Sequence, residues 1–308
     1  MKIFVHDQLH PAGFEKMKRM GIQIISDFAQ IGEADGMIVR GVVADRALLM
    51  KAKNLKVVGK HGAGYNTIDV NAAKELGIRV VYAPGMNAQG VAELIVAMML
   101  DVSRKVSSTY YSLRTGLYDD KKKNELTGCE LFSKTVACLG LGNVSRRAIT
   151  IMQQGFQMKI LGYDNYLPQE VFDSMNVQRF TDLKSMLPLA DYVNISIPLT
   201  PETLNLFDDA MLHCMKPTAI LINTSRGGIV DERALYHALA DNTIAGAGFD
   251  VFSVEPPSNE NPLFSLSNFV GTPHLGGSTE ESIFRVTDTI IDEVVAVLEG
   301  RKPRFEVF

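Results

Sequence analysis

The chain has few of the features that mark secreted, metal-binding or membrane proteins. It contains three cysteines, Cys129, Cys138 and Cys214, and no two of them form a C-x-x-C pair. Neither a disulfide framework nor a zinc site is therefore indicated, and unpatterned thiols are typical of a reduced, cytosolic protein. The longest uninterrupted apolar run, residues 94–100, is far too short to cross a bilayer.

Basic charge is not in excess either. The 31 Lys and Arg residues face 35 Asp and Glu residues, and the net charge of −4 gives no footprint for nucleic acid. Residues 1–7 read as a strand and not as a signal peptide. We therefore expect a cytoplasmic protein with no membrane, nucleic-acid or metal partner. Its length of 308 residues predicts about two domains.

Short apolar runs alternate with segments of helical spacing along the chain, which predicts parallel sheets with helices on their faces. The predicted strands of a first set are residues 3–5, 22–25, 37–39, 55–58 and 78–81. Those of a second set are residues 135–139, 159–161, 192–197, 219–222, 245–249 and 269–270. Long helices are predicted at 90–106 and 280–299, and the polar residues 115–128 are predicted to be a solvated connection.

Three polar residues each come shortly after an apolar run in the C-terminal third. Arg226 follows residues 219–225, Glu255 follows 245–252, and His274 follows 269–273. Each alone is ordinary: a surface arginine, a helix-capping glutamate or a buried histidine. Ligands of open α/β sheets bind outside the carboxyl ends of the strands, so the three side chains are expected to converge on one crevice. A guanidinium, a carboxylate and an imidazole together suit binding a small oxyanion while moving one proton.

A nucleotide-binding turn is predicted upstream of this set. Strand 135–139 leads into Gly140-Leu141-Gly142-Asn143-Val144-Ser145 and then into a helical run. In such a turn the first glycine allows the tight bend, the second lets the backbone approach a pyrophosphate, and helix N-terminal amides hold the charge. Ser145 stands at the position of the third glycine, where it either loosens the packing or reaches a phosphate.

Asp164 strengthens this interpretation because it lies at the end of the next predicted strand. An acidic side chain there hydrogen-bonds the ribose hydroxyls of NAD. Asn165 and Tyr166 supply no cation for a 2′-phosphate, which favours NAD over NADP. The alternative is that Asp164 is a simple turn residue.

The turn and the three polar residues occur in the order found in D-isomer-specific 2-hydroxyacid dehydrogenases, and the chain resembles that family over almost its whole length. The motifs that carry the resemblance are Gly62-Ala63-Gly64-Tyr65-Asn66-Thr67-Ile68-Asp69, Val91-Ala92-Glu93-Leu94, Gly140-Leu141-Gly142, Ser225-Arg226-Gly227-Gly228-Ile229-Val230-Asp231-Glu232, Phe249-Asp250-Val251-Phe252 with Glu255-Pro256, and Thr272-Pro273-His274-Leu275-Gly276-Gly277. Departures from the family pattern are Gly90, Tyr118, Ser133 and Ser145.

The resemblance implies a Rossmann cofactor domain, residues 98–278, inserted into a flavodoxin-like substrate domain formed by residues 1–97 and 279–308. Both would be doubly wound parallel-sheet α/β domains, and similar proteins are usually homodimers. His274 would be the acid/base, Glu255 would orient it, and Arg226 would bind the substrate. The residues implied for NAD binding are Gly140, Gly142, Asn143, Val144, Asp164, Pro198, Thr224, Asp250 and Gly276.

The implied substrate site includes the Gly62-Ala63-Gly64 turn, whose amides can meet a carboxylate. Arg40 and Lys60 end two predicted strands and match basic residues of phosphoglycerate dehydrogenases, although His61 and Tyr65 depart from that pattern. A 3-phosphoglycerate-like acid is the first expectation and a hydroxypyruvate/glyoxylate reductase the second. A non-catalytic NAD-sensing corepressor and an NAD-retaining hydrolase are alternatives of other classes. The physiological acid and the direction of the reaction are left open.

Overall fold

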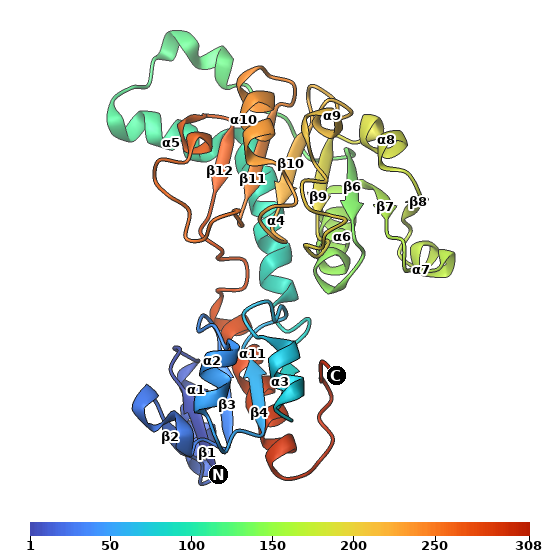
Figure 1. Cartoon of the computed structure of the whole chain (residues 1–308). Helices are drawn as coiled ribbons and strands as arrows, with labels where there is room; N and C mark the ends of the chain where they lie inside the picture. The colour runs from blue at the N-terminus through green and yellow to red at the C-terminus, as the bar shows by residue number, and fades with distance from the viewer. The chain divides into compact units, whose positions relative to one another are not determined.

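Two parallel sheets organise the chain, and each belongs to a separate unit (Figure 1). The computed structural model describes all residues from Met1 to Phe308. Unit 1 comprises Met1–Ala88 and Gly277–Phe308, and unit 2 comprises Gln89–Gly276. The chain thus leaves unit 1, forms unit 2 and returns.

Unit 1 contains a five-stranded sheet with the order β2-β1-β3-β4-β5, in which every pair is parallel. This is the flavodoxin-like order. The strands are β1 (Lys2–Val5), β2 (Gln23–Ile25), β3 (Gly36–Val39), β4 (Val57–Lys60) and β5 (Arg79–Tyr82). The helices are α1 (Pro11–Arg19), η1 (Phe28–Glu33), α2 (Arg46–Lys51), α3 (Val70–Glu75) and α11 (Glu280–Leu298).

Both faces of this sheet are buried, because successive side chains of a strand point to opposite faces. Phe4 packs in a cluster with residues of α2 and α3, whereas its neighbours Ile3 and Val5 pack in a second cluster with α1 and α11. The contact with α11 is close at β4, where a Cβ on Gly59 would lie 2.5 Å from Val294. Helix α11 thereby anchors the returning chain to the centre of the sheet.

Unit 2 contains a seven-stranded sheet with the order β12-β11-β10-β9-β6-β7-β8. The strands are β6 (Thr135–Leu139), β7 (Lys159–Tyr163), β8 (Gln178–Phe180), β9 (Tyr192–Ile195), β10 (Ile220–Asn223), β11 (Gly246–Phe249) and β12 (Phe269–Gly271). The helices are α4 (Ala88–Arg104), α5 (Val106–Thr115), η2 (Asp120–Leu126), α6 (Asn143–Phe156), α7 (Gln169–Ser174), α8 (Leu183–Met186), η3 (Leu187–Leu189), α9 (Asp209–Leu212), α10 (Glu232–Ala240) and η4 (Pro262–Ser265). The strand order reverses between β6 and β9, which is where α/β sheets bind their ligands.

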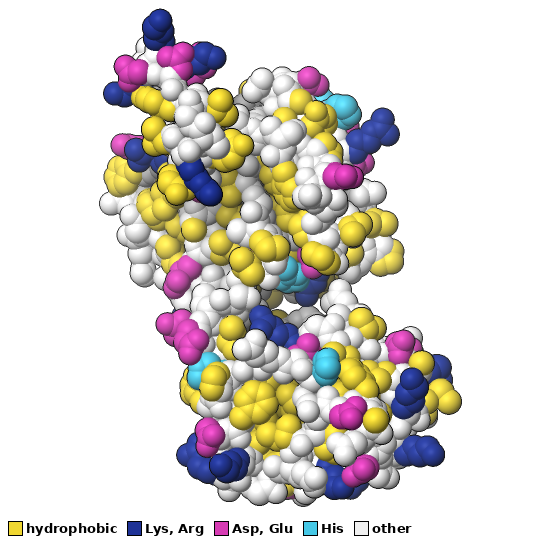
Figure 2. Space-filling view, turned by 90° about the vertical axis from the view of Figure 1, so that its left-hand side faces the viewer, with side chains coloured by type: hydrophobic (Ala, Val, Ile, Leu, Met, Phe, Trp, Pro, Cys, Tyr) yellow, Lys and Arg dark blue, Asp and Glu magenta, His cyan; other side chains and the backbone are white.

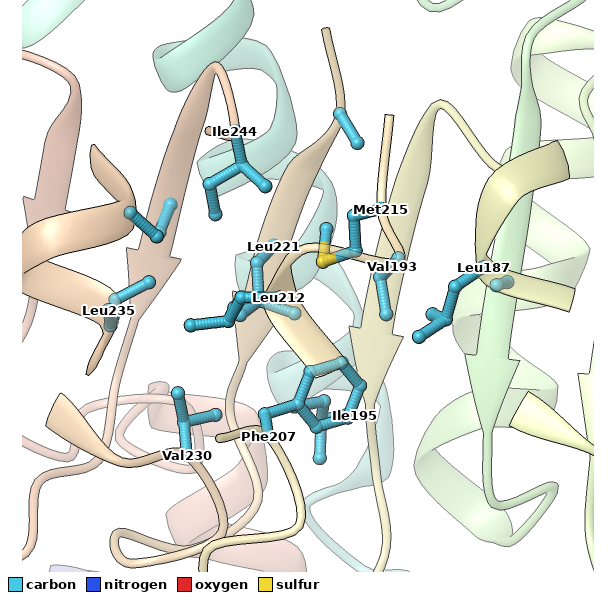
Figure 3. Packing of buried hydrophobic residues seen from close by; sticks show 14 of the residues in the cluster. Leu187, Val193, Ile195, Phe207, Leu212, Met215, Leu221, Val230, Leu235 and Ile244 are labelled. Carbon is cyan, nitrogen blue, oxygen red and sulfur yellow. The ribbon is translucent and has the colours of Figure 1, made fainter. Parts of the chain in front are cut away.

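Two hydrophobic layers enclose this second sheet. One layer joins the strands to α8, α9 and α10, and Figure 3 shows side chains of β9 and β10 interleaved with those of the covering helices. The residues labelled there are Leu187, Val193, Ile195, Phe207, Leu212, Met215, Leu221, Val230, Leu235 and Ile244. The other layer joins the opposite face to α4 and α6. The predicted fold class, two doubly wound parallel-sheet units, is confirmed.

Three details differ from the sequence prediction. The unit boundaries lie at residues 88/89 and 276/277 instead of 97/98 and 278/279, because α4 packs on the unit 2 sheet from Val91 onwards. Strand β8 was missed, since Gln178 and Arg179 make it a polar edge strand without an apolar run. The polar segment 115–128 contains the short helix η2, and α5 precedes it. None of the helices has the length and apolar character required to span a bilayer.

Candidate active site

The turn after β6 has the geometry that a nucleotide phosphate requires. Gly140 has φ +81°, and a Cβ there would lie 2.6 Å from the carbonyl oxygen of Ser196, so only glycine fits. Gly142 caps α6 without a side-chain hydrogen bond, and a Cβ on it would meet no atom within 4 Å. The first helical bond runs from Arg146 N to Gly142 O, so the amides of residues 143–145 have no partner within the helix. Free amides at the open end of a helix form an anion site.

Ser145 occupies the interior of this turn. Its side chain is fully buried and its Oγ has no hydrogen-bond partner. Both sequence expectations for Ser145, looser packing and a contact with phosphate, stay predictions. An unpaired buried hydroxyl costs roughly 1–3 kcal/mol.

Asp164 follows β7 and joins it to the turn. Its Oδ2 accepts a hydrogen bond from Leu141 N at 3.0 Å, and its Oδ1 accepts one from Tyr166 N at 3.0 Å. Each carboxylate oxygen keeps a further lone pair. A cation also lies at this turn, since Arg146 Nε donates to Leu141 O at 2.9 Å. Arg146 was not singled out by the sequence analysis.

His274 and Glu255 form a direct pair. The Nδ1 atom of His274 lies 2.8 Å from Glu255 Oε2, while Glu255 Oε1 accepts a hydrogen bond from Phe252 N at 3.2 Å. The side chains remain 51% and 37% exposed. A carboxylate on Nδ1 favours the tautomer with its proton on that nitrogen. The other ring nitrogen, Nε2, is then free to accept a proton from a bound molecule.

The backbone of His274 adopts the left-handed conformation, with φ +57°. Asp250, which is 1% exposed, holds this turn in place. Its carboxylate accepts hydrogen bonds from Thr272 Oγ1 at 2.7 Å, from Leu275 N at 2.6 Å and from Gly276 N at 2.8 Å, and its carbonyl accepts one from His274 N at 2.8 Å. Left-handed non-glycine residues persist where surrounding contacts impose them, and they cluster at functional sites.

Arg226 lies half-buried in the turn after β10. Its Nη1 donates to Ser225 O at 2.6 Å, the one hydrogen bond that the guanidinium makes. Burial lowers the pKa of Arg226, and the nearby charge of Glu255 opposes that shift. Buried Asn223 fixes the turn, because its Nδ2 donates to Arg226 O at 3.0 Å and its Oδ1 accepts from Ser225 N at 3.1 Å. A desolvated guanidinium with free donors is suited to an oxyanion.

Two further predicted cofactor contacts lie after neighbouring strands. Thr224 follows β10, and its buried Oγ1 has no hydrogen-bond partner. Pro198 lies beyond β9, and its carbonyl accepts a hydrogen bond from Thr203 Oγ1 at 2.8 Å. An orphaned buried hydroxyl and the open space before Gly142 are both features that a bound dinucleotide would fill. No group of three or more His, Cys, Asp or Glu side chains is placed to hold a metal ion.

The predicted substrate residues of unit 1 lie at the carboxyl ends of β3 and β4. Arg40 donates from its backbone to Asp7 Oδ2 at 2.6 Å and from Nη2 to Ser278 Oγ at 3.2 Å. Lys60 is 7% exposed, and its ammonium contacts Arg40 O and, at 2.7 Å, Thr67 Oγ1. These contacts make Lys60 a support for the Arg40 loop, while a contact between Lys60 and substrate stays a prediction.

The Gly62-Ala63-Gly64 turn follows β4 after one residue, His61. Gly62 is tied at both ends, since its N donates to Lys60 O at 2.9 Å and its O accepts from Ala83 N at 3.0 Å. Ala63 is exposed and Gly64 is half-buried. The turn is therefore accessible, as binding of a carboxylate by its amides requires.

A comparison with protein families identifies the family of this chain. Residues 96–276, more than half of the chain, match the NAD-binding domain of D-isomer-specific 2-hydroxyacid dehydrogenases. The chain belongs to this family. NAD is the cofactor that the family's domain binds. The turn at Gly140–Gly142 and the Arg226, Glu255 and His274 set lie inside or at the edge of that domain.

Relatives in the 2-hydroxyacid dehydrogenase family extend this picture. The chain is 37% identical over 308 residues to a D-3-phosphoglycerate dehydrogenase of Methanocaldococcus jannaschii, covering 97% of this chain but 58% of the relative. It is 36% identical over 267 residues to a hydroxypyruvate reductase of Thermotoga maritima, covering 86% and 85%. A crystal structure of a Thermus thermophilus protein matches with a TM-score of 0.89 and 30% identity over both whole chains. The chain thus spans 58% of the length of the phosphoglycerate dehydrogenase.

His61 is a buried histidine at the carboxyl end of β4. Its ring is 6% exposed, and its Nε2 lies 2.8 Å from Thr287 Oγ1. Burial lowers the pKa of His61 to about 4, with further lowering by Arg40 and Lys60 and an opposing effect from Asp7. At neutral pH the imidazole is therefore uncharged.

This buried histidine predicts acid sensitivity. In the unfolded chain the pKa of His61 returns to about 6.5. Between pH 6.5 and 4 the unfolded chain therefore binds a proton at His61 that the folded chain does not bind. Above pH 6.5 this effect leaves the free energy of unfolding unchanged. As the pH falls to about 4, the free energy of unfolding decreases by an amount on the order of 3 kcal/mol. His61→Asn should remove that loss. Urea denaturation at several pH values measures it, and equal pH slopes for the two proteins would contradict the assignment.

Proposed function

We propose that the chain is an NAD-dependent dehydrogenase that interconverts a D-2-hydroxy acid and its 2-keto acid. The observation that carries this proposal is the 2.8 Å contact between His274 Nδ1 and Glu255 Oε2. It leaves Nε2 free in the same unit that holds the desolvated guanidinium of Arg226. An acid/base next to an anion-binding group is what oxidation of a hydroxy acid needs.

In the oxidative direction, His274 Nε2 accepts the proton of the C2 hydroxyl. Glu255 holds the Nδ1 proton and stabilises the imidazolium that forms. Arg226 binds the carboxylate and the C2 oxygen through its planar fork. Bound NAD supplies the acceptor for the hydride that leaves C2. In reduction, His274 returns the proton as a general acid.

The residues proposed to hold the cofactor follow the turn and the strand ends. Gly142, Asn143 and Val144 offer free amides to the pyrophosphate, and Asp164 offers its remaining lone pairs to the adenosine ribose. Thr224 has a hydroxyl without a partner for the nicotinamide end. Asp250 and Gly276, expected at the same end, bond to each other within the chain.

Cofactor choice follows from Asp164. Its carboxylate would repel a 2′-phosphate, and about 1.4 kcal/mol of repulsion already gives tenfold discrimination. We expect kcat/KM for NADH to exceed that for NADPH at least tenfold, and Asp164→Asn to narrow the gap. Steady-state kinetics with both cofactors measure this. Equal values for the unmodified protein would refute the assignment, and they would direct attention to Arg146.

For the substrate we propose an acidic three-carbon acid such as 3-phosphoglycerate, with Arg40 and the Gly62-Ala63-Gly64 turn as its contacts. Arg40 supports this because its side chain makes one hydrogen bond, to Ser278, and keeps further donors. A hydroxypyruvate/glyoxylate reductase is the second candidate, favoured by the similarity to the T. maritima hydroxypyruvate reductase. A panel of 2-keto acids assayed with NADH tests both candidates.

Arg40→Ala should raise KM for 3-phosphohydroxypyruvate far more than KM for glyoxylate, which has no tail to bind. Loss of a charge-assisted contact to phosphate corresponds to about 10- to 100-fold. Ser278→Ala is the matched control, because it removes the partner of Arg40 but keeps the cation. Equal effects of Arg40→Ala on both substrates, or no turnover of the phosphorylated one, would rule out the subsite.

We propose further that the protein works as a homodimer in the cytoplasm. Helix α5 buries none of its residues, and it exposes large apolar side chains that a second copy would cover: Val106, Tyr110, Tyr111 and Leu113. Figure 2 shows hydrophobic side chains in this upper part of the molecule, beside a tip of mixed charge. Three free thiols support a reducing compartment. Sedimentation velocity of Tyr110→Lys against the unmodified protein tests the dimer.

A further inference from the structure

The loop that carries Glu255 is tied to the start of α10 by a second glutamate. Glu232 Oε1 accepts a hydrogen bond from Ser253 N at 2.6 Å, and its Oε2 accepts one from Asn261 Nδ2 at 3.0 Å. These two contacts hold both ends of residues 253–261, a segment without helix or strand. Glu232 itself is fixed, because the adjacent Asp231 caps α10 through Arg233 N and Ala234 N.

The backbone of the same loop lies directly against the backbone of the Arg226 turn. A Cβ on Gly227 would lie 1.9 Å from Phe252 O and 2.5 Å from Ser253 N. No side chain fits between the two segments, so the turn next to Arg226 rests directly on the residues that precede Glu255. The placement of Glu255 relative to Arg226 therefore depends on this contact and on the Glu232 hydrogen bond that fixes Ser253.

We propose that Glu232 is a positioning residue for the reaction, acting through Glu255 on His274. The proposal rests on the acid/base role given to His274 above. Glu255 has one hydrogen bond of its own besides His274, the 3.2 Å bond from Phe252 N, and that amide neighbours the Ser253 amide held by Glu232. Releasing Ser253 frees the loop at the point where the Glu255 carboxylate is anchored. A displacement of about 1 Å at a reacting group costs up to about 100-fold in rate.

The first test is Glu232→Ala. We expect kcat for keto-acid reduction to fall about 10- to 100-fold while NADH affinity, measured by fluorescence titration, stays the same. The pH at which the reductive rate declines should move down, as for Glu255→Gln, because the imidazolium loses its partner in both variants. Glu260→Ala is the matched control. Glu260 lies in the same loop, but its carboxylate makes no hydrogen bond to the protein.

A double-mutant cycle decides whether Glu232 acts through Glu255. In the Glu255→Gln background, Glu232→Ala should lower kcat by no more than about twofold, because the group it positions is already impaired. A merely structural contribution would lower kcat as much in either background. Full additivity of the two substitutions overturns the proposal.

Exchanging donor and acceptor in the hydrogen bond between Glu232 and Asn261 distinguishes loss of this bond from general destabilisation of the fold. Asn261→Asp places two carboxylates against each other but keeps the Asn261 cap on Leu263 N. Adding Glu232→Gln restores a donor opposite the new carboxylate, so the double variant should recover most of the lost kcat. If His274→Ala leaves the reaction intact, the proposed function itself is wrong. If His274→Ala abolishes it while Glu232→Ala and the exchange have no effect, only the positioning role is overturned.

Discussion

Replacement of His274 by alanine is expected to lower kcat for keto-acid reduction by about 10²- to 10⁴-fold while NADH still binds. A positioned acid/base contributes a factor of that order. His274 lies at the edge of the turn held by Asp250, and its contact with Glu255 is the only hydrogen bond of its ring. The change should therefore leave the Gly140–Gly142 turn undisturbed. Stopped-flow reduction with a saturating keto acid, together with fluorescence titration of NADH, measures both quantities.

Glu255→Gln should lower kcat for keto-acid reduction less than His274→Ala does, and it should change the pH dependence of that rate. A neutral amide stabilises the imidazolium less, so the reductive rate should decline at lower pH than in the unmodified protein. His213→Ala, which removes an exposed imidazole from the end of α9, should change neither quantity. Near-unmodified kcat in His274→Ala would assign the acid/base role elsewhere.

Arg226→Lys is expected to lower kcat/KM by about 100-fold or more, although the charge is retained. An ammonium cannot offer two parallel donors to a carboxylate, and each charge-assisted hydrogen bond that is lost corresponds to about 1.5–3 kcal/mol. Because Arg226 binds the substrate carboxylate in this proposal, KM should rise for every 2-keto acid in the panel. That separates it from Arg40, whose loss should affect mainly phosphorylated substrates.

Arg233→Lys is the control for this change. Arg233 is exposed in the first turn of α10, close in sequence to the Arg226 turn, and it makes no side-chain hydrogen bond. Its replacement should leave kcat/KM unchanged. A reaction that tolerates Arg226→Lys would mean that another cation binds the substrate carboxylate.

The buried strands could be predicted because parallel strands enclosed on both faces read as short apolar runs. Val193, Leu221 and Ala247 are all in such runs and all lie in the same packed layer. The pairing of His274 with Glu255 was predictable for a related reason: residues that follow parallel strands gather at one edge of the sheet. Helix α5 escaped prediction since none of its residues is buried and it has no apolar face against the unit.

The supporting residues of the site could not be found in this way. Asn223 acts through bonds to backbone atoms of its own turn, and Glu232 through a bond to the backbone of another loop, and such partners depend on how the chain packs after folding. A signal for Asn223 existed, since a polar residue ends the otherwise apolar strand β10. Glu232 lies in one of the family motifs, next to Asp231, which caps α10. No sequence pattern, however, indicated that Glu232 would accept a hydrogen bond from Ser253 N.

The left-handed backbone of His274 has a consequence for how the protein would change without selection for its reaction. At φ +57° a glycine fits with less strain than a histidine, by roughly 1 kcal/mol. In a protein that kept NAD only as a signal, the backbone at this position would therefore favour replacement of His274. The chain retains a residue that its backbone disfavours, and this residue pairs with the Glu255 carboxylate as the proposed acid/base role requires.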